Sequence, residues 1–446
     1  MTGDDFPIFP KGFALGAATA AYQIEGAVRE GGRGESIWDR FSHTPGKVYQ
    51  GQTGDVASDH YHRWAEDVDL MDQLGLNAYR FSIAWPRIQP QGRGETNPAG
   101  LDFYERLVDA LLARDIQPFV TLYHWDLPQA LQDAGGWPER SVVDLFADYA
   151  AVVVRRLGDR VRHWITLNEP WVFAFVGHYE GRHAPGLTDL RAALRAAHHA
   201  LLAHATATDA IRASSQVDCQ VGIALNPSHV EPASDRQADV DAAWRFDGYL
   251  NRWFLDPLFR GHYPGDMLEF WGDHAPAFDP ADLAGLPTRL DFLGINNYFR
   301  SVIGSGSAPP VDTETHQPSG LYTEMGWEVY PDGLYQLLMR VHRDYEPRSV
   351  YITENGAAFP DALTAGGVVD DPQRVEYLHD YLFAAHRALQ EGVPLHGYFV
   401  WTLMDNFEWA HGFSKRFGLI YVDYATQARF VKASGHWYRK MIQAQS

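Results

Sequence analysis

Residues 162–170 have the sequence RHWITLNEP, in which an apolar run ends abruptly in Asn168, Glu169 and Pro170. Short apolar runs of this kind are typical of buried strands in a parallel sheet, where both faces are covered. Seven other stretches change from apolar to polar in the same way, and amphipathic segments such as 142–157 and 375–389 separate most of them. These stretches are GFALGAATAAYQ (12–23), LNAYRFSIAW (76–85), QPFVTLYHW (117–125), VGIALNP (221–227), LDFLGINNYF (290–299), VYITENG (350–356) and GYFVWTLMDNFEW (397–409).

Eight alternations of strand and helix predict an α/β fold, a (β/α)8 TIM barrel that occupies residues 1–446 as a single domain. No change of composition, short repeat or low-complexity tract marks a linker in the sequence. Residues 226–289 and 300–330 are rich in Gly, Pro and polar residues, so we expect long loops between strand and helix there. Hydrophobic residues make up 46% of the chain and charged residues 21%, which is typical of a protein with a large core.

The charge and cysteine content exclude several classes of partner. The formal net charge is 37 − 57 = −20, so we expect the surface to repel nucleic-acid phosphates and anionic membranes. Cys219 is the single cysteine, which precludes an internal disulfide and favours a reducing compartment. The N-terminal sequence MTGDDFPIFPKG lacks a signal-peptide pattern, and no run of about 18 apolar residues occurs. We therefore expect a cytoplasmic protein with neither nucleic-acid nor membrane partners.

Two glutamates stand at strand ends, Glu169 in TLNEP and Glu354 in ITENG. The carboxyl ends of barrel strands surround the active site, so side chains from the fourth and seventh strands project into the same bowl. Cleavage of a glycosidic bond requires two carboxyl groups, one to protonate the leaving oxygen and one to meet the anomeric carbon. Their separation decides between retention and inversion of configuration, and the residues alone leave both outcomes open.

The chain resembles glycoside hydrolase family 1 over nearly its whole length. The resemblance rests on FALGAATAAYQIEGA (13–27), TLYHWDLPQALQDAGGW (121–137), TLNEPW (166–171), YITENG (351–356) and DNFEWAHGFSKRFGLIYVDY (405–424). It implies that Glu169 is the acid/base, that Glu354 is the nucleophile and that configuration is retained. It also implies a β-glucosidase that removes terminal β-D-glucosyl residues from small β-glucosides or cello-oligosaccharides.

The same resemblance implies a set of residues around the catalytic pair. Arg80 and Tyr298 are expected to contact the nucleophile, with Asn296 beside them. Trp401 is expected beneath the apolar face of the sugar, since C–H faces stack on indole rings. Trp327 is expected to stack on the leaving-group side. The remaining expected substrate-binding residues are Gln23, His124, Asn168, Glu408, Trp409 and Phe417.

The sequence predicts no cofactor and no metal site. Neither a GxGxxG nor a GxxxxGK[ST] loop follows a strand, and the histidines lack the HExxH spacing. We therefore interpret His60, His62, His198, His199 and His204 as surface or hydrogen-bonded core residues.

Several alternatives share these motifs. A β-galactosidase, β-fucosidase or transglycosylase of the same family remains open, as does the oligomeric state. A non-catalytic sugar-binding protein on the same barrel is disfavoured because both carboxylates are present. A 6-phospho-β-glycosidase is disfavoured because a charged Glu408 would repel a phosphate, and Lys415 is the neighbouring cation that a phosphate would use.

Overall fold

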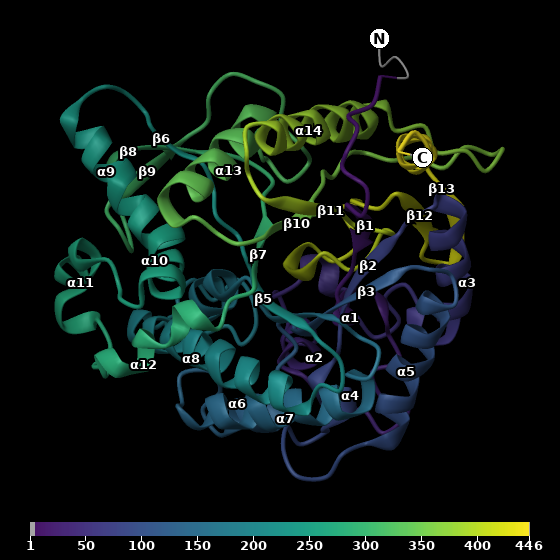
Figure 1. The fold of residues 1–446 in the computed structure, drawn as a ribbon, viewed down its shortest axis with the longest axis horizontal. Helices are drawn as coiled ribbons and strands as arrows, with labels where there is room; N and C mark the ends of the chain where they lie inside the picture. The colour runs from purple at the N-terminus through teal and green to yellow at the C-terminus, as the bar shows by residue number, and fades with distance from the viewer. Residues whose placement is uncertain (1–4, 446) are drawn as a thin grey trace.

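The computed structural model describes residues 5–445 and contains a closed barrel of eight parallel strands (Figure 1). The barrel closes where the first strand pairs with both the second strand and the last strand. Around the barrel the strands are β1 (Ala14–Ala18), β2 (Ala78–Ser82), β3 (Gln117–Tyr123), β4 (His163–Asn168), β5 (Gln220–Leu225), β7 (Phe292–Asn296), β10 (Val350–Asn355) and β11 (Leu395–Trp401). Each overlaps one predicted stretch, so the predicted (β/α)8 barrel is confirmed.

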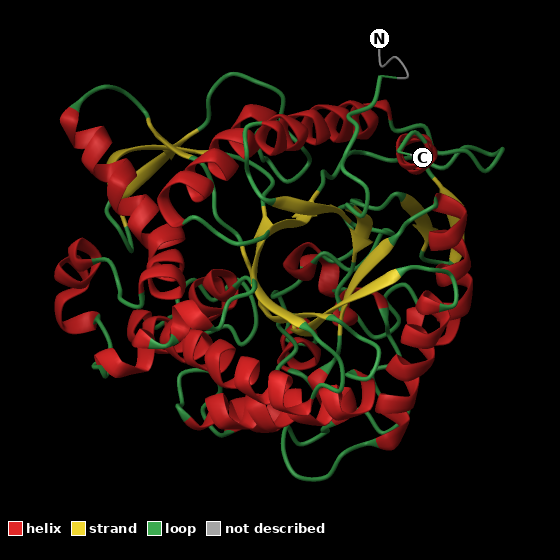
Figure 2. Cartoon of the chain, viewed as in Figure 1, coloured by secondary structure: helices red, strands yellow, loops and turns green. Residues whose placement is uncertain are grey.

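Helices form an outer layer around the strands (Figure 2). The predicted helices 142–157 and 375–389 correspond to α7 and α14, whose apolar faces are buried against the barrel. The main helices of this layer are α3 (His60–Leu74), α5 (Pro98–Leu112), α7 (Ser141–Leu157), α8 (Leu190–Ser214), α13 (Pro331–Tyr345), α14 (Pro372–Gln390) and α15 (Ala433–Gln443). Shorter helices are α1 (Ala21–Ile24), α2 (Ile37–Ser42), α4 (Trp85–Ile88) and α6 (Gln129–Asp133). Among residues 5–445, no helix combines the length and the apolar character needed to cross a bilayer.

The lower interior of the barrel is filled by aromatic rings that face glycines on neighbouring strands. A Cβ atom at Gly222 would come within 2.4 Å of the Phe292 ring, and one at Gly16 within 2.7 Å of the Phe399 ring. The Phe399 ring also packs edge-on against Phe119, with centroids 4.9 Å apart. Alternating large and absent side chains in this way fills the barrel without a channel. Function is therefore confined to the rims.

The structure contradicts the expectation that 226–289 is only loop. Four helices lie in it: α9 (Gln237–Asp247), α10 (Trp253–Arg260), α11 (Gly265–Trp271) and α12 (Pro280–Ala284). The strand β6 (Val230–Pro232) also belongs to it and forms a small sheet with β8 (Ser301–Ala308) and β9 (Thr313–His316). Ala242 and Ala243 of α9 pack on Ile303 of this sheet. Tertiary packing therefore stabilises regular elements within a segment whose overall Gly, Pro and polar content predicted loops.

Candidate active site

A cavity of about 390 Å3 opens at the carboxyl ends of the barrel strands. Arg80, Gln23 and Asn168 lie behind its wall, where they hold other side chains. The other predicted site residues line it directly: His124, Glu169, Asn296, Tyr298, Trp327, Glu354, Trp401, Glu408, Trp409 and Phe417. The structure thus brings the predicted set together at one end of the barrel.

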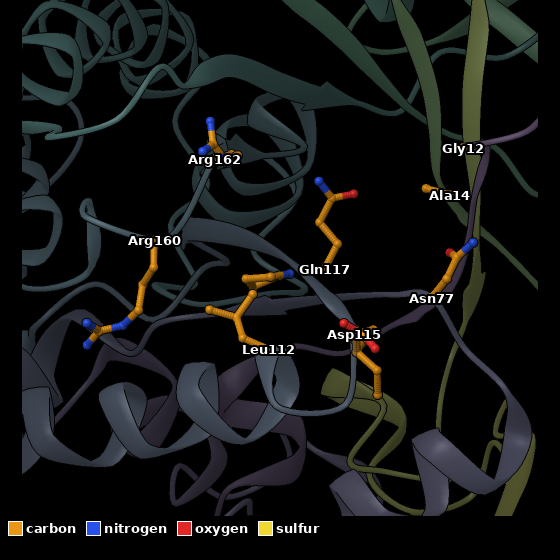
Figure 3. Close-up of a pocket in the computed structure, with 10 residues that line it drawn as sticks. Gly12, Ala14, Asn77, Leu112, Asp115, Gln117, Arg160 and Arg162 are labelled. Carbon is orange, nitrogen blue, oxygen red and sulfur yellow. The ribbon is translucent and has the colours of Figure 1, made fainter.

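A second hollow, of about 430 Å3, lies at the amino ends of the strands (Figure 3). Two of its polar side chains, Asn77 and Arg160, already have structural partners. The Asn77 amide donates to Phe13 O and accepts from Leu15 N. Arg160 pairs with Glu105 at 2.7 Å and with Asp109 at 3.0 Å. These contacts hold the amino ends of the strands in place. They therefore indicate a structural role and not a ligand site.

Glu354, in β10, is held at both carboxylate oxygens. Arg80 Nη1 donates to Oε1 at 2.6 Å, and the Tyr298 hydroxyl donates to Oε2 at 2.5 Å. Burial raises the pKa of Glu354, whereas Arg80 and Tyr298 oppose that increase by stabilising the charged form. The result is a fixed carboxylate with two charge-assisted donors and only 3% of its surface exposed.

Glu169 follows β4 in the left-handed region, with φ at +46°. Its backbone N–H donates to Ala224 O at 2.8 Å, which aims the side chain into the cavity. One carboxyl oxygen accepts from Asn296 Nδ2 at 2.7 Å. Burial, followed by the charge of Glu354, raises the pKa of Glu169 to about 8. A single proton shared by the two carboxyl groups therefore resides on Glu169, which has fewer donors than Glu354.

Hydrogen bonds from Arg80 fix the protonation pattern of the site. Asn168 Oδ1 accepts from Arg80 Nη2 at 2.5 Å and from Asn296 Nδ2 at 3.0 Å. The Asn168 amide nitrogen consequently faces His124 Nε2, at 3.0 Å, as a donor. Burial, together with the charge of Arg80, keeps the pKa of His124 well below its usual value, so the ring is neutral. The proton of His124 therefore lies on Nδ1, which is buried and has no hydrogen-bond partner among the described residues.

Gln23 lies on α1 rather than at a strand end, and supports the loop after β11. Its Nε2 donates to Phe407 O at 2.9 Å, to Asn406 Oδ1 at 3.1 Å and, more weakly, to Glu408 Oε2 at 3.4 Å. Burial, followed by the charge of Glu354, raises the pKa of Glu408 to about 8. The Glu408 charge on which the exclusion of phosphate was predicted to depend therefore develops mainly above neutral pH.

A cluster of buried ions anchors the same loop from behind. Asp405 accepts from Lys432 Nζ at 2.7 Å and from Arg416 at 2.6 Å. Lys432 also contacts Asp361, which in turn pairs with Arg374 at 2.9 Å. This ion cluster ties the loop of Glu408 to the segment between the hairpin of β12 (Ile420–Asp423) and β13 (Ala428–Val431) and helix α15.

The leaving-group side of the cavity is formed by Trp327, whose ring lies 5.0 Å from that of Tyr298. An ion pair connects the residues beside these rings. Arg300 donates to both oxygens of Glu328, at 2.8 and 3.0 Å, and lies 3.7 Å from the Tyr330 ring. Arg300 follows Tyr298 by two residues and Glu328 follows Trp327 directly, so the pair fixes how the two aromatic residues face each other.

Sequence reasoning missed part of the lining. Trp125, Asn226, Pro227, Asn297 and Phe299 lie at the ends of predicted strand stretches, so their position was a usable signal. The other missed residues belong to helical and loop segments whose approach to the mouth depends on the tertiary fold. They include Trp171, Val172, Val176, Arg182, His183, Phe246, Leu250, Met325 and His411.

The histidines singled out in the sequence make internal or surface contacts. His60 bonds to Asp67 at 2.7 Å, and His204 bonds to Thr166 at 2.8 Å. The buried His198 and His199 bond to Tyr263 Oη and to Trp137 O, while the exposed His62 contacts Asp59 and Glu30. In the part of the chain that the structure describes, no cluster of three or more His, Cys, Asp or Glu residues is arranged to hold a metal ion.

Comparisons with known proteins agree with this geometry. The β-glucosidase A of Thermotoga maritima is 50% identical over 436 residues, covering 97% of both chains. A bifunctional β-D-glucosidase/β-D-fucosidase of Bifidobacterium breve is 46% identical over 462 residues, covering 98% of both. The solved family 1 β-glucosidase of T. maritima superposes with a TM-score of 0.96 at 48% identity, covering 99% of each chain. The family model described as glycosyl hydrolase family 1 matches residues 7–446, and the chain belongs to that family.

Proposed function

We propose that this protein is a retaining β-glucosidase in which Glu354 is the nucleophile and Glu169 is the acid/base. The observation that carries the proposal is the unequal environment of the two carboxyl groups. Glu354 is held ionised by Arg80 and Tyr298, whereas the pKa of Glu169 is raised to about 8. One charged and one protonated carboxyl group is the arrangement that the first step of glycoside cleavage requires.

In the first step, Glu354 attacks the anomeric carbon while Glu169 gives its proton to the departing oxygen. The C–O bond to the leaving group breaks and an ester bond to Glu354 forms. The negative charge of Glu354 is consumed, and with it the repulsion that raised the pKa of Glu169. Glu169 is then a carboxylate in the intermediate, hydrogen-bonded by Asn296.

In the second step, water attacks the anomeric carbon from the side that the leaving group has vacated. Glu169 takes the proton of that water, the ester bond to Glu354 breaks, and glucose leaves with its β configuration retained. The solved complex of the T. maritima enzyme with a cyclophellitol analogue, described as a transition-state mimic, supports the assignment by similarity.

The test is the variant Glu354→Gly with 4-nitrophenyl β-glucoside. Hydrolysis should fall by several orders of magnitude because the nucleophile is lost. Added azide should then occupy the vacated space and yield the α-glucosyl azide, identified by NMR. Folded Glu354→Gly that turns over at the wild-type rate would rule out the assignment.

Hydrolysis of β-fucosides is the second activity that a specific observation favours. The relative in B. breve, 46% identical over nearly its whole length, is named for both glucosidase and fucosidase activity. A β-D-fucoside differs from a β-glucoside in lacking the 6-hydroxyl and in carrying an axial 4-hydroxyl, so its relative rate measures how well the site tolerates both changes together. The measurement is kcat/KM for 4-nitrophenyl β-fucoside against the β-glucoside.

We also propose that residues 1–446 form one catalytic domain and that the protein is cytoplasmic. The first and last barrel strands, β1 and β11, pair directly, so the site needs both halves of the chain. The presence of one cysteine is compatible with a reducing compartment. Limited proteolysis that released a stable, active half would contradict the single domain.

A further inference from the structure

The mouth of the active-site cavity differs in charge from its floor, the inner end at the carboxyl ends of the barrel strands. The ionisable acidic side chains that line the cavity are Glu169, Glu354 and Glu408, and all three are buried at the strand ends. Toward the outside, the ionisable lining consists of Arg182, His183 and His411. A basic rim is unexpected on a chain with a formal net charge of −20. We call Arg182, His411 and the adjacent Lys415 the basic rim.

The backbone places the basic rim directly above the floor of the cavity, where Glu408 lies. His411 N donates to Glu408 O at 2.9 Å, and Glu408 N donates to Gly412 O at 2.7 Å. One tight turn therefore carries Glu408 inward and the exposed His411 outward. The neighbouring ring of Trp409 lies 6.4 Å from that of His183, which follows Arg182 in the chain.

The three basic groups are close enough to influence one another. Burial, followed by the charges of Lys415 and Arg182, lowers the pKa of His411. Lys415 Nζ donates to Glu324 O at 2.8 Å, next to the cavity-lining Met325. The fixed cations of the rim are therefore Arg182 and Lys415, with His411 as an uncharged donor at neutral pH.

Arg182 retains binding capacity although it has an acidic partner. Its Nε donates to Glu180 at 2.7 Å, and Nη2 contacts the same oxygen. The Nη1 edge takes no part in that ion pair, and 66% of the side chain is exposed. A guanidinium with an open edge binds a carboxylate through charge-assisted hydrogen bonds.

We propose that the basic rim selects β-glucosides whose leaving group carries a carboxylate, such as phenolic-acid glucosides, with Arg182 as the main contact. The proposal rests on the proposed function and specifies the leaving-group class of the same site. The charged Glu354 on the floor of the cavity repels an anion, so an acidic leaving group has one favourable orientation, with the neutral sugar inward and the carboxylate at Arg182. This orientation is also the productive one, since the glycosidic bond then lies at Glu169.

The test compares 4-(carboxymethyl)phenyl β-glucoside with its amide, because the methylene group keeps the acidities of the two phenols similar. The quantity measured is the ratio of kcat/KM for the acid over the amide, at low ionic strength. We expect a ratio of about 2–5 in the wild type, the range for an ion pair at an exposed site. Added 0.5 M salt should reduce it, since surface charges are screened.

Variants of the ion pair provide matched controls. Arg182→Gln should lower the ratio to one or below, Arg182→Lys should keep most of it, and Glu180→Gln should raise it because the competing carboxylate is removed. A wild-type ratio of one or less, or an unchanged ratio in Arg182→Gln, overturns the proposal. If the wild type cleaves neither substrate, the proposed β-glucosidase function fails instead, so the two failures are distinguishable.

Discussion

The hydroxyl group of Tyr298 donates a hydrogen bond to Glu354 across 2.5 Å. This contact and the one from Arg80 are what distinguish the charged carboxylate from the protonated Glu169. The two donors come from different strands or their ends, so the distinction is built into the barrel and does not depend on the ligand.

Tyr298→Phe should lower kcat/KM about 10- to 150-fold, because a hydrogen bond to a charged group contributes roughly 1.5–3 kcal/mol. The lost donor also raises the pKa of Glu354. Glu354 acts as the carboxylate, so the acidic limb of the pH profile should move to higher pH. Tyr381→Phe is the matched control, since that hydroxyl donates to the backbone oxygen of Tyr298 at 3.3 Å and accepts from Tyr330 N at 3.1 Å, without a bond to Glu354. An acidic limb that stays in place in Tyr298→Phe contradicts the prediction.

Glu169 must be protonated for the first step, so activity on poor leaving groups should fall as pH rises through about 8, the pKa of Glu169. A 2,4-dinitrophenyl glucoside needs little protonation, and formation of its intermediate should lack this basic limb. Glu408 has a similar pKa of about 8, so Glu408→Gln is the control and should retain the limb. Stopped-flow measurement of the first turnover separates the steps. A basic limb that disappears in Glu408→Gln would assign the titration to that residue instead.

At pH 8.5, where the Glu408 carboxylate has formed, Glu408→Ser should weaken binding of plain glucosides about 10- to 150-fold for each hydrogen bond lost to it, taking roughly 1.5–3 kcal/mol per bond. It should also lower the preference for 4-nitrophenyl β-glucoside over its 6-phosphate. Because the pKa of Glu408 is about 8, the wild-type preference should grow between pH 6.5 and 8.5 as the carboxylate forms. Lys415 already bonds Glu324 O at 2.8 Å, so phosphate must compete for it. A preference that is the same in wild type and variant would count against this role of Glu408.

Arg300→Met should loosen the packing of the Trp327 ring against the Tyr298 ring, because it removes both hydrogen bonds that Arg300 donates to Glu328. We expect KM for cellobiose to rise about 3- to 10-fold while kcat changes little, as for the loss of roughly 1 kcal/mol of binding. Arg343→Met is the control, since that exposed arginine pairs with Asp344 on the outside of α13. A loss of kcat with unchanged KM would place the effect in the chemistry and contradict a positioning role.

Lys432→Met should reduce the free energy of unfolding by about 3–5 kcal/mol, because Asp361 and Asp405 remain buried with one cation fewer. The measurement is urea unfolding followed by tryptophan fluorescence. Lys440→Met, at an exposed position of α15, is the control and should change stability by less than about 0.5 kcal/mol. If both variants unfold at the same urea concentration, the buried ion cluster does not stabilise the fold.

The barrel could be predicted because its strands carry a local signal. Each buried strand is a continuous apolar run, and Glu169 and Glu354 stand where such runs stop. Gln23 shows the limit of that signal, because the predicted stretch 12–23 continues past β1 into α1. The side-chain amide of Gln23 supports a loop nearly 400 positions later in the chain, at Phe407.

The helices within 226–289 and the outer lining could not be predicted for a different reason. α9 is stabilised by the sheet that β8 and β9 form with β6, a contact between segments about 60 residues apart. The basic rim likewise combines Arg182 with His411, which neither composition nor periodicity relates. The two hydrogen bonds that Asn168 accepts from Arg80 and Asn296 depend on side-chain orientation, a property of the folded chain.

The pairing of β1 with β11 has a consequence for how the protein is made. β1 emerges from the ribosome before the other barrel strands, whereas β11, its partner on one side, with Gly397 opposite Ala14, emerges after all of them. Until then β1 presents a free strand edge, which is the kind of surface that recruits chaperones or aggregates. Lys432, which neutralises Asp405 behind the Glu408 loop, emerges later still. A nascent chain therefore acquires its hydrolase activity in one late event, and translation that stops before residue 432 produces an inactive, aggregation-prone fragment rather than a weak enzyme.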